Sequence, residues 1–396
     1  MESGDIAWML VSTALVLFMV PGLALFYGGM VRSKNVLNMI MMNLYCLGAV
    51  SVVWVLAGYS LGNAGDSGFV GSLTAHWGLH DIDTSEEIVS VAFLMTFAAI
   101  TPALISGAVA DRMRFAAWAV FVPVWSLLVY SPVTFWVYSG WMEKWGVLDF
   151  AGGTAIHVNA GIAALAVVLV LGRRRGWPEE AMPPHNLVYV VLGAGILWFG
   201  WFGFNAGSAG AADFRAAQAF LNTFVAGAAG MLAWLAVERL RDGHPTTLGA
   251  ASGVVAALVA ITPAAGFVAG LAPIVFGAVA GVACYFAIQL KTRLGYDDSL
   301  DVVGVHMVGG LVGGLLLGFF ADPSAFGADF QAGVLFGGGE LLGDQIVSMG
   351  AVLAYSFGVT YVLARILDAV IGLRVDEETE VIGLDQTEHA ESAYVE

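Results

Sequence analysis

The stretch AWMLVSTALVLFMVPGLALFYGG runs from residue 7 to residue 29 without an acidic or basic side chain. A helix needs about 20 apolar residues to cross a hydrocarbon layer of roughly 30 Å, so this stretch predicts a membrane span. Similar runs recur along the chain, which has 59% hydrophobic and only 12% charged residues. Soluble domains carry roughly 25% charged residues. The sequence therefore predicts an all-α integral membrane protein.

Working outward from this stretch, the apolar runs predict eleven transmembrane helices. They are Ala7–Gly29, Val36–Leu61, Ile88–Ala110, Phe115–Trp136, Asp149–Leu171, Leu187–Gly207, Ala216–Val237, Thr247–Ala264, Val268–Leu290, Val302–Phe320 and Asp344–Leu367. We expect one transmembrane domain, residues 1–370. A cytoplasmic C-terminal tail, residues 371–396, follows it, with eight acids and no basic residue after Val375.

Basic residues predict the orientation, because cytoplasmic loops of membrane proteins are enriched in Lys and Arg. Of the fifteen basic residues, only Lys144 and Arg215 fall on the opposite side from the others. This distribution predicts a multi-pass protein of the plasma (cytoplasmic) membrane, with its N-terminus outside and its C-terminus in the cytoplasm.

Eleven spans divide into an inverted five-plus-five repeat with an extra C-terminal helix, an arrangement found in many transporters. The fifth span carries Asp149 and, eight residues later, His157. The tenth begins near Asp301 and carries His306 five residues later. An acid followed by a histidine therefore recurs in corresponding spans, and we expect both acids to cap their helices.

The two histidines are the strongest functional signal, because ionisable groups inside a membrane are costly and usually face an interior cavity. At 1.5 Å per residue, the two rings fall about 10 Å apart in depth, near the middle of the bilayer. They could meet directly or through one small molecule. Neutral imidazole has one donor and one acceptor nitrogen, so the pair could hold a small polar guest. The alternative is a pair that only joins two helices.

Several aromatic residues have two interpretations. Phe93, Phe97 and Phe204 either pack in the bundle or close a narrow passage whose rings attract cations. Trp136 and Tyr138 form either an interfacial aromatic belt or a rim that collects cations.

Other features exclude alternatives or indicate packing. Cys46 and Cys284 lie in apolar spans, so neither a disulfide nor a metal site is expected. The sequence has no basic patch, so a nucleic acid partner is not expected. No cofactor is predicted. Glycines from Gly309 to Gly318 repeat four apart, which lets helix backbones approach closely.

The combination of motifs resembles the ammonium transporter / methylammonium permease / Rhesus family, in particular its bacterial and archaeal ammonium transporters. The matching runs cover nearly the whole chain in family order: Gly22–Gly29, Asp149–Thr154 leading to His157, Trp201–Gly210, Asp301–His306, and Gly372–Val375 with His389 and Tyr394.

This resemblance implies a homotrimer with one pore per protomer. It implies a twin-histidine pore of His157 and His306 with Trp201, a gate of Phe97 and Phe204, an ammonium recruitment site of Ser208 with Tyr138 or Trp136, and a structural acid, Asp149. Two departures stand out. The loop that carries Trp136 and Tyr138 is about one residue shorter than in the family. Ala390 replaces the usual glycine between His389 and Glu391.

The expected function is transport of ammonium, with methylammonium as a further candidate substrate. Ammonium binds at the outer site, loses a proton, and passes the histidines as neutral ammonia. The alternative is an ammonium sensor (transceptor) with little net flux. An enzyme is not expected, because no nucleophile or third metal ligand accompanies the histidines. The tail suggests a PII-type signal protein as a partner.

Overall fold

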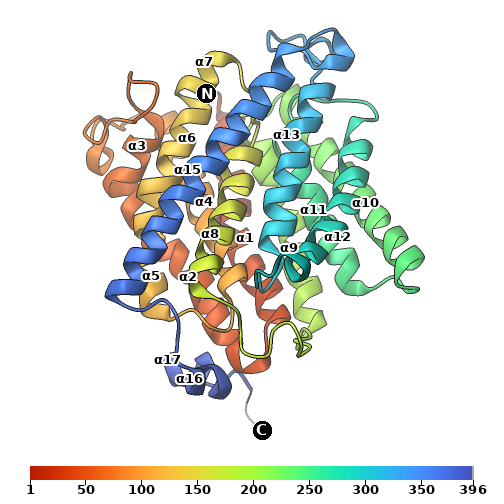
Figure 1. Ribbon diagram of the computed structural model, residues 1–396. Helices are drawn as coiled ribbons and strands as arrows, with labels where there is room; N and C mark the ends of the chain where they lie inside the picture. Colours follow the sequence, from red (N-terminus) through yellow and green to blue (C-terminus); the bar gives the residue numbers. More distant parts are fainter. Residues whose placement is uncertain (395–396) are drawn as a thin grey trace.

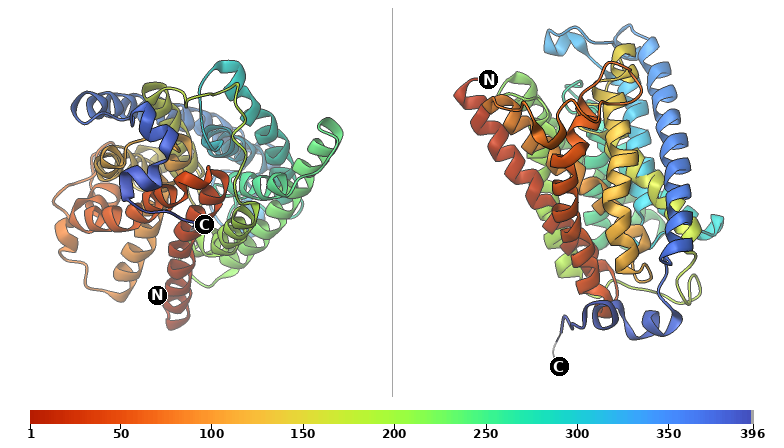
Figure 2. Two further views of the ribbon diagram at one scale, coloured as in Figure 1. Left: turned by 90° about the horizontal axis from the view of Figure 1, so that it is seen from below. Right: turned by 90° about the vertical axis from the view of Figure 1, so that its left-hand side faces the viewer.

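The computed structural model describes residues 1–394, which fold into a bundle of membrane-length helices with the N- and C-termini at opposite ends (Figures 1 and 2). Its principal helices are α1 (Ser3–Met30), α2 (Val36–Val53), α3 (Tyr59–Asn63), α4 (Ser85–Val109), α5 (Phe115–Trp125), α6 (Ser131–Tyr138), α7 (Trp141–Trp145), α8 (Asn159–Leu171), α9 (Leu187–Gly207), α10 (Phe214–Arg241), α11 (Thr247–Ile261), α12 (Ala272–Leu294), α13 (Val308–Phe320) and α15 (Glu340–Val370).

Short helical segments complete the fold. Four π-helices continue or precede the spans: η2 (Trp54–Gly58), η4 (Ser126–Tyr130), η5 (Gly153–Val158) and η6 (Val303–Met307). Outside the spans lie η1 (Ser33–Asn35), η3 (Trp77–Leu79), α14 (Pro323–Phe326), η7 (Val334–Phe336), α16 (Glu377–Ile382) and α17 (Leu384–His389).

Within residues 1–394, ten helices are long and apolar enough to cross a membrane. The eighth predicted span, α11, has 15 residues and packs among α9, α10, α12 and α13. It ends at Ile261, where Thr262 and Pro263 begin a turn. The all-α membrane fold is therefore confirmed, although several predicted edges are wrong. The fifth span begins at Gly153 and not at Asp149, and the ninth begins at Ala272 and not at Val268.

The two histidine-bearing spans cross each other near the centre of the bundle. The segment η5 packs against α13, and η6 packs against α8, so the start of each span contacts the other span. Their chain directions are opposite in Figure 1, as the inverted repeat predicts. Close approach depends on glycine. A Cβ on Gly161 would lie 2.4 Å from the Met307 backbone nitrogen, and a Cβ on Gly310 would lie 2.7 Å from the Gly153 carbonyl oxygen.

We expect Gly161→Ala to separate the two histidine-bearing spans. The new methyl group would meet backbone atoms of Met307, which cannot turn aside as a flexible side chain can. Overpacking of this kind typically costs about 1–3 kcal/mol. The melting temperature in detergent should fall. The matched control is Gly350→Ala in α15, where a Cβ meets nothing within 4 Å. It should raise stability by up to about 1 kcal/mol through helix propensity. Equal effects of the two variants would contradict close packing as the role of Gly161.

The tail after Leu373 packs against η1 and the start of α2. In the view from below in Figure 2, α16 and α17 lie across the ends of the first helices, and α17 contacts η1 and α2. Asp385 accepts hydrogen bonds from the backbone N–H groups of Leu37 and Asn38. His389 Nε2 lies 3.0 Å from Asn38 Oδ1, and Tyr394 Oη lies 2.7 Å from His185 Nε2. The described tail is therefore a docked segment. Residues 395–396 of the predicted tail lie outside the described residues.

Ala390 occupies a position that favours glycine. It follows α17 with φ of 55°, in the left-handed region, where an L-residue with a Cβ pays roughly 1–2 kcal/mol. We expect Ala390→Gly to strengthen docking, seen as slower proteolysis or slower hydrogen exchange of residues 384–394. Ala393→Gly is the control, because Ala393 has no positive φ and should gain nothing. Faster proteolysis of Ala390→Gly than of the wild type would contradict this expectation.

Candidate transport pore

The two buried histidines contact each other directly. Their Nδ1 atoms lie 3.2 Å apart, and the rings are nearly parallel, with centroids 5.3 Å apart. They are only 2% and 4% exposed. This is closer than the predicted depth difference, because His157 lies only four residues after its helix begins at Gly153. Each ring belongs to a π-helix, a local irregularity that is often found at functional sites.

Each histidine-bearing span starts at a capping acid. Asp149 Oδ1 accepts hydrogen bonds from the N–H groups of Gly152 and Gly153, and its Oδ2 accepts those of Thr154 and Ala155, all at 2.7–3.0 Å. Asp149 is therefore a helix cap, as predicted. A carboxylate here compensates backbone donors that a helix start leaves without partners.

The prediction that Asp301 caps the second histidine-bearing span is wrong. Asp298 Oδ2 accepts the hydrogen bond from Val303 N at 2.7 Å, whereas Asp301 pairs with Lys291 at 2.6 Å. Asp301 has a φ of 65°, in the left-handed region, and its carboxylate is engaged by Lys291. Burial raises the pKa of Asp298 to about 6. Asp298 precedes His306 by eight residues, the same spacing as Asp149 and His157. This equal spacing is the sequence signal that identifies Asp298.

An aromatic stack lies beside the histidine pair. The rings of Phe97 and Phe204 stack with centroids 4.2 Å apart and an interplanar angle of 14°, and Phe93 contacts Phe97. Trp201 stacks on His157 at 5.6 Å, and its Nε1 donates to Thr262 Oγ1. The structure therefore brings these predicted residues together with the histidines.

Three cavities follow one another through this region. The first, which we name the outer cavity because it lies at the end of the bundle that holds Met1, has a volume of about 290 Å³ and is lined by Phe93, Phe97, Tyr138 and Ser208 among others. A narrow middle cavity, of about 10 Å³, lies among apolar side chains with His157, Trp201, Phe204 and His306. That volume corresponds to about one water-sized molecule. The inner cavity, of about 300 Å³, shares Phe26, Val255 and His306 with the middle one.

The outer cavity distinguishes the two aromatic candidates for recruitment. Tyr138 lines the cavity, and so does Ser208, whose Oγ donates to the Phe204 carbonyl. Trp136 is not among the lining residues. Its Nε1 donates to the Phe69 carbonyl, and its ring packs against Tyr355. Residues 136 and 138 lie on different sides of the same helix, about 200° apart. Of the two predicted rings, Tyr138 therefore lines the outer cavity and Trp136 does not, and the recruitment role of either ring stays a prediction.

Comparison with known proteins identifies the family. The profile described as Ammonium Transporter Family matches residues 7–394.

The chain belongs to the ammonium transporter family.

An ammonium transporter of Mycobacterium tuberculosis is 51% identical over 99% of this chain and 90% of that protein. An ammonium transporter of Bacillus subtilis is 46% identical over 100% of this chain and 99% of that protein. The crystal structure of Saccharomyces cerevisiae Mep2 superposes with a TM-score of 0.90 at 34% identity, covering 96% of this chain and 88% of that chain. A structure described as a sensor Amt protein superposes with a TM-score of 0.91 at 25% identity, covering 98% of each chain.

Membership in the ammonium transporter family confirms the resemblance, the fold and the predicted function. The chain is a multi-pass membrane protein that transports ammonium. The sequence did not predict the π-helices, Asp298 as a cap, or the acidic residues that line the inner cavity. The acids Glu238 and Asp242 stand four residues apart near the end of α10, a spacing that places both on one helix face.

Proposed function

We propose that ammonium is transported through the line of three cavities and that the histidine pair conducts it as neutral ammonia. The contact between His157 and His306, set between the outer and inner cavities, is the observation that carries this proposal. Tyr138 and Ser208 recruit the cation, and Phe97 and Phe204 form the gate. Trp201 lines the pore beside His157, and Asp149 holds the start of the histidine-bearing helix in place.

The middle cavity explains how ammonium is separated from potassium. Its lining is apolar except for the imidazoles and the Trp201 indole, whose N–H already bonds Thr262. Transfer of a bare cation from water into such surroundings costs several kcal/mol or more, whereas transfer of a neutral polar molecule costs much less. Ammonium can lose a proton and potassium cannot. His157 Nε2 is buried without a hydrogen-bond partner among the described residues, so it offers a nitrogen to a small guest.

The transport proposal is tested on wild-type protein in proteoliposomes. Adding ammonium should produce a current or a flux that potassium at the same concentration does not produce. The alternative is a sensor with little net flux, which one structural neighbour's description favours. Robust ammonium flux would exclude a pure sensor, and binding without flux would favour it. Methylammonium can be measured in the same preparation as a second substrate. No enzymatic step is part of the proposal.

The proposed assembly is a homotrimer in the plasma membrane. We propose one pore per protomer, because all residues of the proposed route come from one chain. Residues 1–370 form the membrane domain, and 371–396 form the cytoplasmic tail. The distribution of basic residues favours an outer N-terminus. Cross-linking in membranes should stop at three chains, and a C-terminal tag should be accessible only from the cytoplasmic side.

The docked tail is a candidate contact for a PII-type signal protein. Its carboxylates at Asp385 and Glu388 bond backbone N–H groups at the starts of α2 and α5, so the tail touches helices that lead toward the pore. Deleting the residues after Asp376 should change the flux or its response to an added PII-type protein. No change in either measurement would remove this idea.

A further inference from the structure

Arg215 is a basic side chain at the outer end of the bundle. It stands in the first turn of α10, and the preceding loop reaches the N-terminal segment, where Ala212 N donates to Asp5 Oδ1 at 2.9 Å. In the predicted orientation only Lys144 shares this side with it. A positive charge is also unfavourable in the first turn of a helix, because that end carries the positive pole of the helix dipole. Neither membrane orientation nor helix stability therefore accounts for Arg215.

Three aromatic rings, which we name the phenylalanine cage, surround the Arg215 guanidinium. Its central carbon lies 5.6 Å from the centre of the Phe267 ring and 5.8 Å from the centres of the Phe326 and Phe330 rings. The cage is continuous, because the Phe330 centroid lies 5.0 Å from that of Phe267 and 6.1 Å from that of Phe326. Aromatic faces attract cations, so the cage holds the guanidinium in one place.

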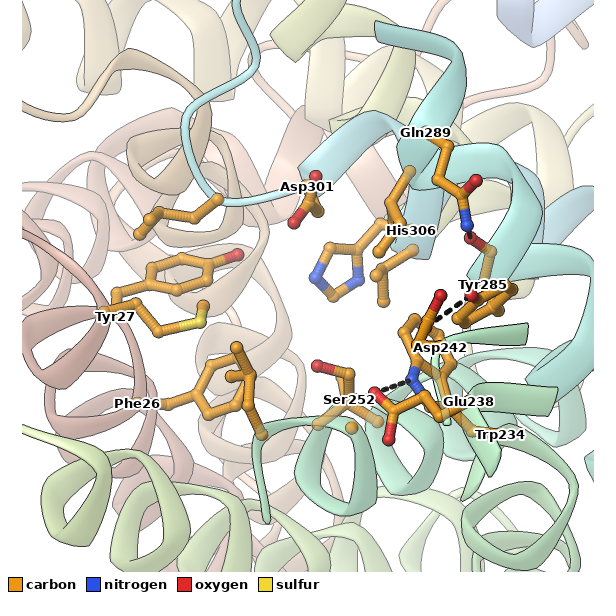
Figure 3. A pocket seen from close by; sticks show the side chains of 17 residues that line it. Phe26, Tyr27, Trp234, Glu238, Asp242, Ser252, Tyr285, Gln289, Asp301 and His306 are labelled. Carbon is orange, nitrogen blue, oxygen red and sulfur yellow. Dashed lines mark hydrogen bonds between the residues drawn. The ribbon is translucent and has the colours of Figure 1, made fainter. Parts of the chain in front are cut away.

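The caged guanidinium has no oxygen partner within residues 1–394. Aromatic rings attract its charge but provide no oxygen for its five N–H donors. Elsewhere in the bundle such groups are paired, since Arg174 donates to Asp297 at 2.8 Å. In the inner cavity, Glu238 accepts a hydrogen bond from Trp234 at 3.2 Å (Figure 3). The N–H donors of Arg215 therefore remain available to an acceptor from outside the chain.

The acids near the cage in sequence do not supply this acceptor. Asp213 accepts a backbone N–H group at the start of α10, and Asp322 accepts two at the start of α14. Asp329, beside Phe330, is exposed and forms no ion pair with Arg215 among the described residues. Two of the three carboxylates are therefore used as helix caps, and none neutralises the guanidinium.

An apolar stripe leads away from the cage along α10. The Phe214 ring contacts Phe326 at 5.9 Å and is 62% exposed. Leu221 and Phe224 follow it by seven and ten residues, which places all three on one helix face, and both are more than half exposed. At 1.5 Å per residue the stripe is about 15 Å long. This length matches one leaflet, since the hydrocarbon layer of a bilayer is roughly 30 Å thick.

We propose that Arg215 and the phenylalanine cage bind the phosphate of a phospholipid in the outer leaflet, with an acyl chain along the stripe of Phe214, Leu221 and Phe224. The donors of a guanidinium match two phosphate oxygens at once. The cage orients the guanidinium beforehand, so that less freedom is lost on binding. The phosphate also offsets the unfavourable charge in the first turn of α10. Arg215 lines none of the three cavities, so the site is separate from the proposed transport route.

The test measures the melting temperature of the full-length protein in detergent as phosphatidylglycerol is added. Lipid that binds the folded state should raise the melting temperature. Arg215→Met removes the charge at similar length and should raise the lipid concentration for a half-maximal shift about tenfold, the effect expected for losing charge-assisted hydrogen bonds. Arg215→Lys should give an intermediate value, because an ammonium group cannot form the paired contact. Phosphatidylcholine, which has the same phosphodiester, should also distinguish the wild type from Arg215→Met.

The matched control is Lys144→Met, which removes the other basic side chain of the outer side, at an exposed position outside the cage. Its lipid response should equal that of the wild type. Two further additions identify the ligand. Inorganic phosphate should not distinguish the wild type from Arg215→Met, and neither should a glucosyl diacylglycerol with the same acyl chains and no phosphate. If Arg215→Met does not fold, Arg215→Lys and Phe326→Leu decide, and both should weaken the lipid response several-fold.

Four results would overturn the site. The first is a lower melting temperature of Arg215→Met in lipid-free detergent with an unchanged lipid response, which would make Arg215 only a clamp between outer loops. The second is an equal difference with the glucosyl lipid, which would leave acyl-chain contact alone. The third is a difference with inorganic phosphate, which would indicate a free-anion site. The fourth is loss of the oligomer, seen by native mass spectrometry, with an unchanged lipid response, which would place Arg215 in a contact between copies.

Discussion

Replacing His157 or His306 with alanine should reduce the ammonium-to-potassium current ratio by at least about tenfold, the effect of losing one hydrogen bond of roughly 1.4 kcal/mol. Each ring lines the narrow middle cavity, where it is among the few polar groups next to the passage. Truncation removes a partner for ammonia and leaves the other imidazole without its 3.2 Å contact. It also widens the passage, so that water can accompany a cation. Both consequences act against selectivity.

The measurement is electrical recording on proteoliposomes of the wild type and each histidine variant, with ammonium and potassium in turn. The matched control is His80→Ala, which makes the same chemical change at an exposed ring in the loop between α3 and α4, where Asp81 is the ring's one salt-bridge partner among the described residues. That variant should keep the wild-type ratio. Wild-type selectivity in both pore variants would show that the pair only joins two helices, the structural alternative that the sequence left open.

Asp149→Ala should have the largest effect on stability. One carboxylate accepts four backbone N–H groups at the start of η5, and all four would lose their partner in a buried environment. An orphaned buried donor costs roughly 1–3 kcal/mol, so the total should be on the order of 4 kcal/mol or more. Because the same turn positions His157, ammonium flux should be lost together with thermal stability.

An ordinary helix cap provides the comparison. Asp213 accepts only the Ala216 N–H at the start of α10, so Asp213→Ala should cost about 1 kcal/mol. Melting temperatures in the same detergent give the order of the two variants. The melting temperature of Asp149→Asn should lie between those of Asp149→Ala and the wild type, because its amide keeps one oxygen acceptor. Equal losses for Asp149→Ala and Asp213→Ala would contradict the proposed role of Asp149 in holding the pore helix.

The sequence by itself determined the class of the protein. Apolar runs and basic loops are local properties, and each can be read from about 20 residues without knowledge of their neighbours. His157 and His306 were identified for the same reason, since an ionisable group within an apolar run is unusual wherever its partner lies. The family motifs added Phe97, Phe204 and Ser208, whose side chains the structure then placed at one passage.

Only the tertiary structure decided which of two neighbouring residues faces the route. Tyr138 lines the outer cavity, whereas Trp136, two positions earlier, packs against Tyr355. Asp298 caps the second histidine-bearing helix, while Asp301 pairs with Lys291. The acids of the inner cavity and the docked tail likewise depend on helices far apart in the chain. These outcomes depend on how each helix is rotated about its axis and on the residue at which it begins. Contacts between segments far apart in the chain fix both properties, and the hydropathy averaged along one span carries no information about either.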